Sequence, residues 1–185
     1  MTMSDARPVG AIQIRIERVS QLFNTLDPDP FRSRDLAPEA EAYIVDWAEE
    51  VPTAAPLSIM VHLPAAQATS PDAAGLPDAL GHFFAYRAAT LARELKELFH
   101  TGRIALLIGL CVLGICLVIA QSVAGRIGER TFSDFVAEGL IIVGWVALWR
   151  PLEIFLYDWW PLLRRRNLYR RIAAARVEVR TEAGA

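Results

Sequence analysis

Three ionisable side chains stand in or beside the apolar part of the chain: Glu138, Arg150 and Glu153. In a membrane-embedded helix such residues are functional candidates, because an unpaired charge in hydrocarbon is costly. Arg150 and Glu153 are three residues apart, so on a helix they share a face and can form an ion pair. One acid and one base do not make a proton relay, so a structural pair is the simpler interpretation. Glu138, about one turn from the end of its apolar segment, is interpreted as an interfacial carboxylate.

The remaining sequence predicts no catalytic, cofactor or metal site. The motifs CxxC, HExxH, GxGxxG, GxxxxGK[ST] and GxSxG are all absent. The histidines fall in separate predicted elements: His62, His82 and His100. Four acids gather around an Asp–Pro turn without the spacing of a calcium loop: Asp27, Asp29, Asp35 and Glu39. We therefore do not expect an enzyme.

The elements that must position the charged residues are two apolar segments. Ile104 to Ala120 contains no charged residue. With Gln121–Ala124 it reaches about 31 Å as a helix, enough for a hydrocarbon core of about 30 Å. In a soluble protein a helix that is apolar on every side requires a large surrounding core, which this chain cannot supply. Residues 104–124 are therefore predicted to be a transmembrane helix.

The second apolar segment is harder to delimit. Phe135–Trp149 alone gives about 22 Å, which is too short for a span. We predict a span over 135–158, kinked near Pro151, with Arg150 in the inner leaflet and its head group reaching the interface. In the alternative, Arg150 marks the boundary and Pro151–Leu163 lies along the interface. Aromatic and basic residues are predicted to anchor the interface: Trp149, Tyr157, Trp159, Trp160, Arg164, Arg165 and Arg166.

Basic residues predict the orientation of this helical hairpin. They are concentrated before the first apolar segment and after the second, whereas the short loop at 125–134 carries only Arg126 and Arg130, balanced by two acids. The positive-inside rule then places both termini in the cytoplasm, with the loop on the other side. No signal peptide is visible at the N-terminus, and a bacterial inner membrane is our default location.

The first third of the chain has the pattern of a small α/β domain. Ala11–Glu17 and Leu57–Leu63 alternate between apolar and polar residues, which is typical of half-buried strands. Between them Pro38–Val51 carries one apolar stripe, as expected of a helix. The order strand–helix–strand favours parallel strands. Residues 175–180 are expected to return as a third strand.

The predicted boundaries follow from these patterns. Residues 1–77 form the cytoplasmic α/β domain, with an Ala- and Pro-rich linker at 64–77. An amphipathic helix at 78–103 leads into the first span, and residues 159–185 form an Arg-rich tail. The fold class is thus an α+β membrane protein, in which a two-helix transmembrane hairpin is joined to a small strand–helix–strand domain.

Charge and the lack of a catalytic motif limit the function. Residues 1–86 carry 12 acids and 5 bases, net −7, and residues 150–185 carry 8 arginines and 4 acids, net +4. The acidic domain argues against nucleic-acid binding, and the basic tail suits anionic lipid. We expect an interaction or assembly protein whose partners are the bilayer and either a second copy or another membrane protein. The alternatives are a homo-oligomeric channel or transport component and a membrane-bound enzyme acting on a lipid or a small cytosolic molecule.

Overall fold

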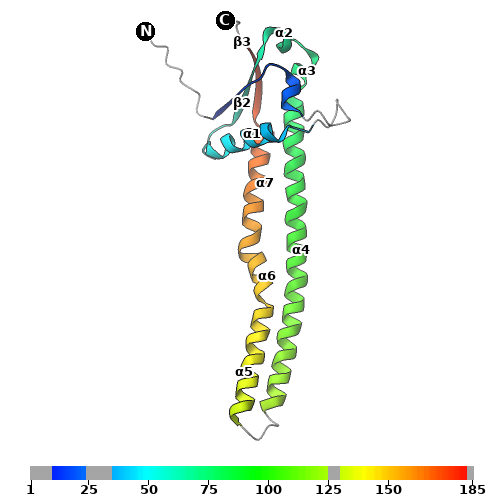
Figure 1. The fold of residues 1–185 in the computed structure, drawn as a ribbon, viewed down its shortest axis with the longest axis vertical. Helices are drawn as coiled ribbons and strands as arrows, with labels where there is room; N and C mark the ends of the chain where they lie inside the picture. The colour runs from blue at the N-terminus through cyan, green and yellow to red at the C-terminus, as the bar shows by residue number, and fades with distance from the viewer. Residues whose placement is uncertain (1–9, 24–34, 125–129, 183–185) are drawn as a thin grey trace, which may run out of the picture. The chain divides into compact units, whose positions relative to one another are not determined.

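The computed structural model describes residues 10–23, 35–124 and 130–182, which divide into two compact units. Unit 1 combines the first 90 residues with residues 165–185, and unit 2 comprises residues 91–164. Most of the described chain is helical, and a small sheet lies in unit 1 (Figure 1).

Unit 1 is built on a three-stranded parallel sheet with the order β1-β2-β3. Its strands are β1 (Ala11–Arg15), β2 (Ser58–Pro64) and β3 (Arg176–Glu182). In the register Ile59 lies between Ile12 and Val177, so these apolar side chains share one face. Met60 follows between Gln13 and Glu178 on the other face. The alternation seen in the sequence therefore corresponds to one apolar and one largely polar face.

Two connections of very different length join the parallel strands. The first passes through a short 3₁₀ turn, η1 (Val19–Leu22), and helix α1 (Pro38–Glu50), with a proline in the first turn and acids next to it. The second runs from Pro64 to Arg176 and contains all of unit 2. The expected strand–helix–strand order is thus present, and the returning strand is β3.

The residues expected to form a linker at 64–77 are instead the end of β2, two short helices and the start of a long helix. They are α2 (Ala65–Ala68) and α3 (Pro71–Ala74). Ser70 caps α3 by accepting a hydrogen bond from the backbone N–H of Ala73 at 3.2 Å, with Pro71 in the first turn. The Ala- and Pro-rich composition that predicted a linker thus belongs to short helices, one of which starts at a Ser-Pro pair.

The core of unit 1 lies where the apolar sheet face meets the helices. Phe84 on helix α4 (Leu76–Ala124) is fully buried and stacks on Tyr169 of helix α7 (Trp159–Ala173), with ring centroids 5.8 Å apart. Arg171 on α7 donates hydrogen bonds to the backbone carbonyls of Val51, Pro52 and Ala55 at 2.7 to 3.0 Å. These three contacts fix the loop between α1 and β2.

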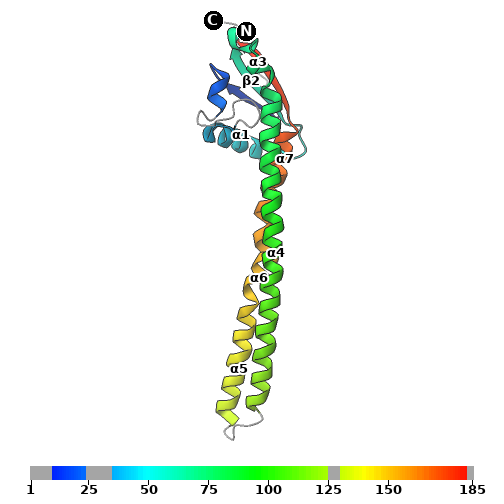
Figure 2. The ribbon, with the colours of Figure 1, turned by 90° about the vertical axis from the view of Figure 1, so that its right-hand side faces the viewer.

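Unit 2 consists of two helical arms that run side by side in both views (Figures 1 and 2). The first arm belongs to α4 (Leu76–Ala124), a single helix of 49 residues. The expected amphipathic helix at 78–103 and apolar helix at 104–124 are therefore continuous. The second arm contains α5 (Arg130–Ala147), α6 (Trp149–Glu153), a π-helical turn η2 (Ile154–Asp158) and the start of α7 (Trp159–Ala173).

The second arm departs from the predicted limits. The helix expected to begin at 135 begins at Arg130, so only residues 125–129 of the expected loop remain, and these lie outside the described residues. The expected tail at 159–185 begins as α7. The break expected near Pro151 falls at Leu148, because Pro151 has no N–H to donate to the carbonyl of Ala147.

Small residues allow the arms to pack closely. A Cβ on Gly109 would lie 2.8 Å from the backbone oxygen of Ala147, and one on Gly144 would lie 2.6 Å from Leu113 Cδ1. Gly109 therefore lets α4 approach the carbonyl that Pro151 cannot satisfy, which suits a weak Cα–H···O contact. Cys116 and Ala120 continue this buried seam.

Outside the seam both arms expose large apolar side chains. In the most apolar 18-residue stretch, only 17% of residues are buried in the first arm and 22% in the second. Both arms are long and apolar enough to cross a membrane. The exposed residues include Leu107, Ile108, Ile115, Val118, Ile142, Val143, Trp145 and Val146. The core helix of a soluble protein would be mostly buried.

Candidate functional site

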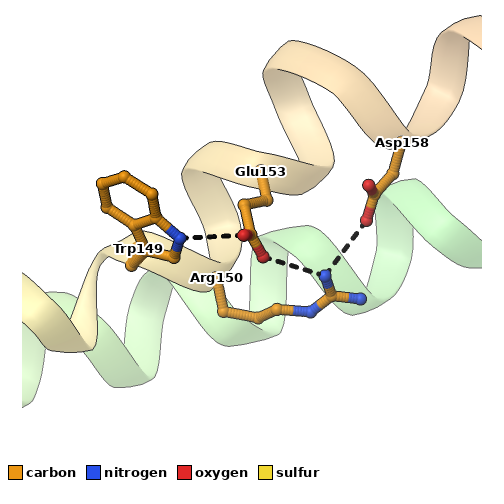
Figure 3. A network of polar contacts seen from close by, with 4 residues as sticks. All are labelled: Trp149, Arg150, Glu153 and Asp158. Carbon is orange, nitrogen blue, oxygen red and sulfur yellow. Dashed lines mark hydrogen bonds and ion pairs between the residues drawn. The ribbon is translucent and has the colours of Figure 1, made fainter.

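A polar cluster interrupts the apolar surface of the second arm (Figure 3). Arg150 Nη1 lies 3.2 Å from Glu153 Oε2 and 3.1 Å from Asp158 Oδ2, and the indole N–H of Trp149 donates to Glu153 Oε1 at 2.8 Å. The ion pair expected between Arg150 and Glu153 is present. The Arg150 side chain is 62% exposed, so the cluster lies on the surface of the arm.

The π-helical turn brings Asp158 into the cluster. Arg150 and Asp158 are eight residues apart, a spacing that does not align side chains on an ideal α-helix. The i→i+5 turn over Ile154–Asp158 accommodates an extra residue and rotates Asp158 toward the face of Arg150. Arg150 thereby extends along the arm toward Asp158, away from α5, in the direction expected of a snorkelling arginine.

The other predicted polar and anchor residues do not join this cluster. Glu138 is exposed on α5. Tyr157 and Trp160 are also exposed, whereas the indole N–H of Trp159 donates to the carbonyl of Phe155 at 2.9 Å. The three predicted basic anchors lie on α7: Arg164, Arg165 and Arg166.

A second polar cluster lies in unit 1 around Glu41. The Glu41 side chain is 14% exposed and accepts two hydrogen bonds. Arg87 Nη2 donates to Oε2 at 2.7 Å, and the Tyr169 hydroxyl donates to Oε1 at 2.9 Å. Glu41 thus links α1, α4 and α7 through two charge-assisted bonds.

Both partners of Glu41 have shifted proton affinities. The hydrogen bond to Glu41 raises the pKa of Arg87 above its ordinary value. Burial raises the pKa of Tyr169, and the hydrogen bond to Glu41 raises it further, against the opposing effect of Arg165. The neutral tyrosine and the charged arginine are therefore the forms that this cluster favours.

Sequence reasoning missed Asp158, Glu41 and Tyr169 as cluster members. Glu41 lies in the first turn of α1, where the helix dipole alone accounts for an acid, and the π-helical turn has no evident sequence signal. For Asp158 the available signal was a second acid near Arg150 in an otherwise apolar segment.

The described residues contain no candidate metal centre. Within residues 10–23, 35–124 and 130–182, no group of three or more His, Cys, Asp or Glu side chains is placed to bind a metal ion. Of the acids near the Asp–Pro turn, Asp27 and Asp29 lie outside these residues. No protein-family model, curated protein or solved structure matches the chain.

Charge balance in the cluster around Arg150 can be tested by rescue. Arg150→Leu leaves two carboxylates without their cation and should destabilise the protein by about 1–3 kcal/mol, between the values for exposed and buried pairs. Adding Glu153→Gln and Asp158→Asn removes the unbalanced charge and should restore the melting temperature measured on the full chain in detergent. Arg164→Leu is the matched control. A triple variant no more stable than Arg150→Leu would contradict the role in charge balance.

Tyr169 predicts a pH dependence of stability. Because its pKa is raised by folding, its contribution is complete below the ordinary value of about 10 and is lost as the pH rises through the folded value. Tyr169→Phe should cost about 1–3 kcal/mol at pH 7, the range for a hydrogen bond to a charged group. Above pH 10 the variant should lose less stability than the wild type. Hydrogen exchange of β2 amides in the micelle-bound full chain measures both effects, and parallel pH profiles would contradict this assignment.

Proposed function

We propose that this protein is an integral membrane protein of the assembly type, which holds a small α/β domain at the membrane surface beside a partner protein. The observation that carries the membrane assignment is the exposed apolar surface of both arms in unit 2. The arms pack through a narrow seam of small residues and leave their large apolar side chains outward. In water this surface would be unstable, whereas lipid chains would cover it.

The register of the arms supports a position for the membrane boundary. Gly102 faces Ile154, and Gly109 faces Ala147. Arg150 therefore lies level with about residue 106, roughly one turn beyond Arg103 toward the apolar segment. With the boundary near these arginines, the span of the second arm covers 130–149, about 30 Å. Glu138 then lies about 12 Å inside this span instead of at the interface, and Trp149 is the aromatic residue at the boundary. This favours the alternative in which Arg150 marks the boundary, although the segment after it continues as a helical arm.

The sheet supports a common location of both chain ends. β3 pairs with β2 although the whole hairpin lies between them in the sequence. If the hairpin crosses the bilayer twice, β2 and β3 are on the same side, as their pairing requires. The positive-inside rule makes this side the cytoplasm, and a bacterial inner membrane is our proposed location.

The proposed assembly role rests on the polar face of the sheet. Gln13, Arg15, Arg176 and Arg180 are exposed there, and Glu178 pairs with both Arg176 and Arg180. Parallel sheets are ordinarily covered on both faces. A partner with an acidic surface would complement this face, and the partner is either a second copy or another membrane protein. The channel alternative is less favoured, because Arg150 is neutralised within its own arm.

Membrane insertion can be tested with the two native cysteines. Cys111 is exposed on α4 and Cys116 is buried in the seam. In opened native membranes a membrane-impermeant maleimide should label neither, because lipid covers Cys111, and it should label both after denaturation in SDS. An Arg170→Cys variant is the control; it should react in opened membranes but not in intact cells. Labelling of Cys111 as rapid as that of Arg170→Cys would contradict insertion.

Assembly can be tested by the mass of the purified protein in mild detergent, with cross-linking in native membranes. We expect a defined complex, either a homo-oligomer or a stoichiometric complex with one other protein. Arg180→Glu should weaken it about tenfold or more, because it places a like charge against an acidic partner. Arg170→Glu, the same change on α7, should not.

A monomer without a reproducible cross-link would contradict the assembly role. If Arg180→Glu and Arg170→Glu weakened the complex equally, the polar face of the sheet would not be the surface that binds the partner.

A further inference from the structure

An open groove runs along the two arms of unit 2. It has a volume of about 590 Å³ and is lined by Ala92, Leu95, Lys96, Phe99, Arg103 and Phe155. Its α4 residues recur every three or four positions and therefore share one helix face. Phe99 stacks on Phe155 of the other arm, with ring centroids 6.1 Å apart, and supplies an aromatic wall. The groove is thus mostly apolar with two cationic side chains.

The two cations of the groove are available to a ligand. Arg103 Nε donates to the carbonyl of Phe99 at 3.3 Å, which holds the guanidinium against α4 beside the aromatic wall. In the described part of the chain, neither the terminal nitrogens of Arg103 nor the Lys96 ammonium has a hydrogen-bond or ion-pair partner. Arg150, by contrast, is paired with two carboxylates. The acids nearest in the sequence, Glu94 and Glu97, do not line the groove.

The spacing of the cations suits one phosphate group between them. Lys96 and Arg103 are seven residues apart, about 10.5 Å along the helix axis. Both have long side chains, so their head groups can converge on a single anion in the groove. A guanidinium binds phosphate oxygens in a fork, and an ammonium adds a point charge.

We propose that this groove binds one anionic phospholipid, with its phosphate between Lys96 and Arg103, its ester region against Phe99 and Phe155, and its acyl chains continuing along the apolar segment that begins at Ile104. The proposal rests on the membrane insertion argued above, because the groove then lies beside the charge-free segment that begins at Ile104. The aromatic wall favours a lipid over a soluble phosphate. Two cations without a nearby partner favour an anionic headgroup over a zwitterionic one, whose own ammonium they would repel.

The test is lipid binding by the full-length protein in mild detergent, measured by native mass spectrometry. The probes are dioleoyl phosphatidylglycerol, dioleoyl phosphatidylcholine and glycerol 3-phosphate. We expect the wild type to prefer phosphatidylglycerol over phosphatidylcholine by about tenfold or more, and Lys96→Gln/Arg103→Gln to reduce this preference below about threefold. Arg15→Gln/Arg18→Gln loses the same charge in unit 1, outside both the groove and the basic tail, and should keep this preference.

Three results would overturn the proposal: no preference in the wild type, the same loss in both double variants, and binding of glycerol 3-phosphate as tight as that of the lipid. Alkaline carbonate extraction of native membranes separates this failure from that of the proposed function. If the protein resists extraction but shows no lipid preference, only the lipid site in the groove is refuted. If carbonate extracts the protein, membrane insertion is refuted.

Discussion

The pairing of β2 with β3 is the interaction on which the rest of the structure depends. The central strand takes one neighbour from the first part of the chain and the other from its last residues, with both helical arms in between. Because both strands belong to one sheet, the second arm must return to where the first began. Any element inserted between them, a membrane hairpin included, must bring the chain back to the same side.

Where the two arms of unit 2 approach most closely, the fit depends on backbone groups more than on large side chains. Pro151 removes the N–H that would bond the Ala147 carbonyl, and Gly109 is the residue that faces this carbonyl. The π-helical turn is a second irregularity of this arm. The extra rotation that it introduces allows Arg150 to reach Asp158. Two departures from α-helical geometry thus each have a partner that compensates for them.

Much of the fold was predictable because it follows from local periodicity. Alternation at 11–17 and 57–63 predicts β1 and β2, and the apolar stripe predicts α1. The helices at Ala65–Ala68 and Pro71–Ala74 were missed because Pro and Ser start helices as well as loops. The sequence predicted Arg150 with Glu153, which are one turn apart. It did not predict Asp158 or the bonds of Glu41 to Arg87 and Tyr169, because these depend on a helix irregularity and on tertiary contacts across 46 and 128 positions.

The long excursion between β2 and β3 also sets the order of events during synthesis. The two strands are separated by 111 residues, so at about 5–20 residues per second some 6–22 s pass between the emergence of one and the other. Throughout this interval β2 presents an unpaired edge and an unfinished apolar face, both of which chaperones and proteases recognise. A chain that stalls within the arms never completes its sheet. The sheet is therefore completed only after both arms have been synthesised.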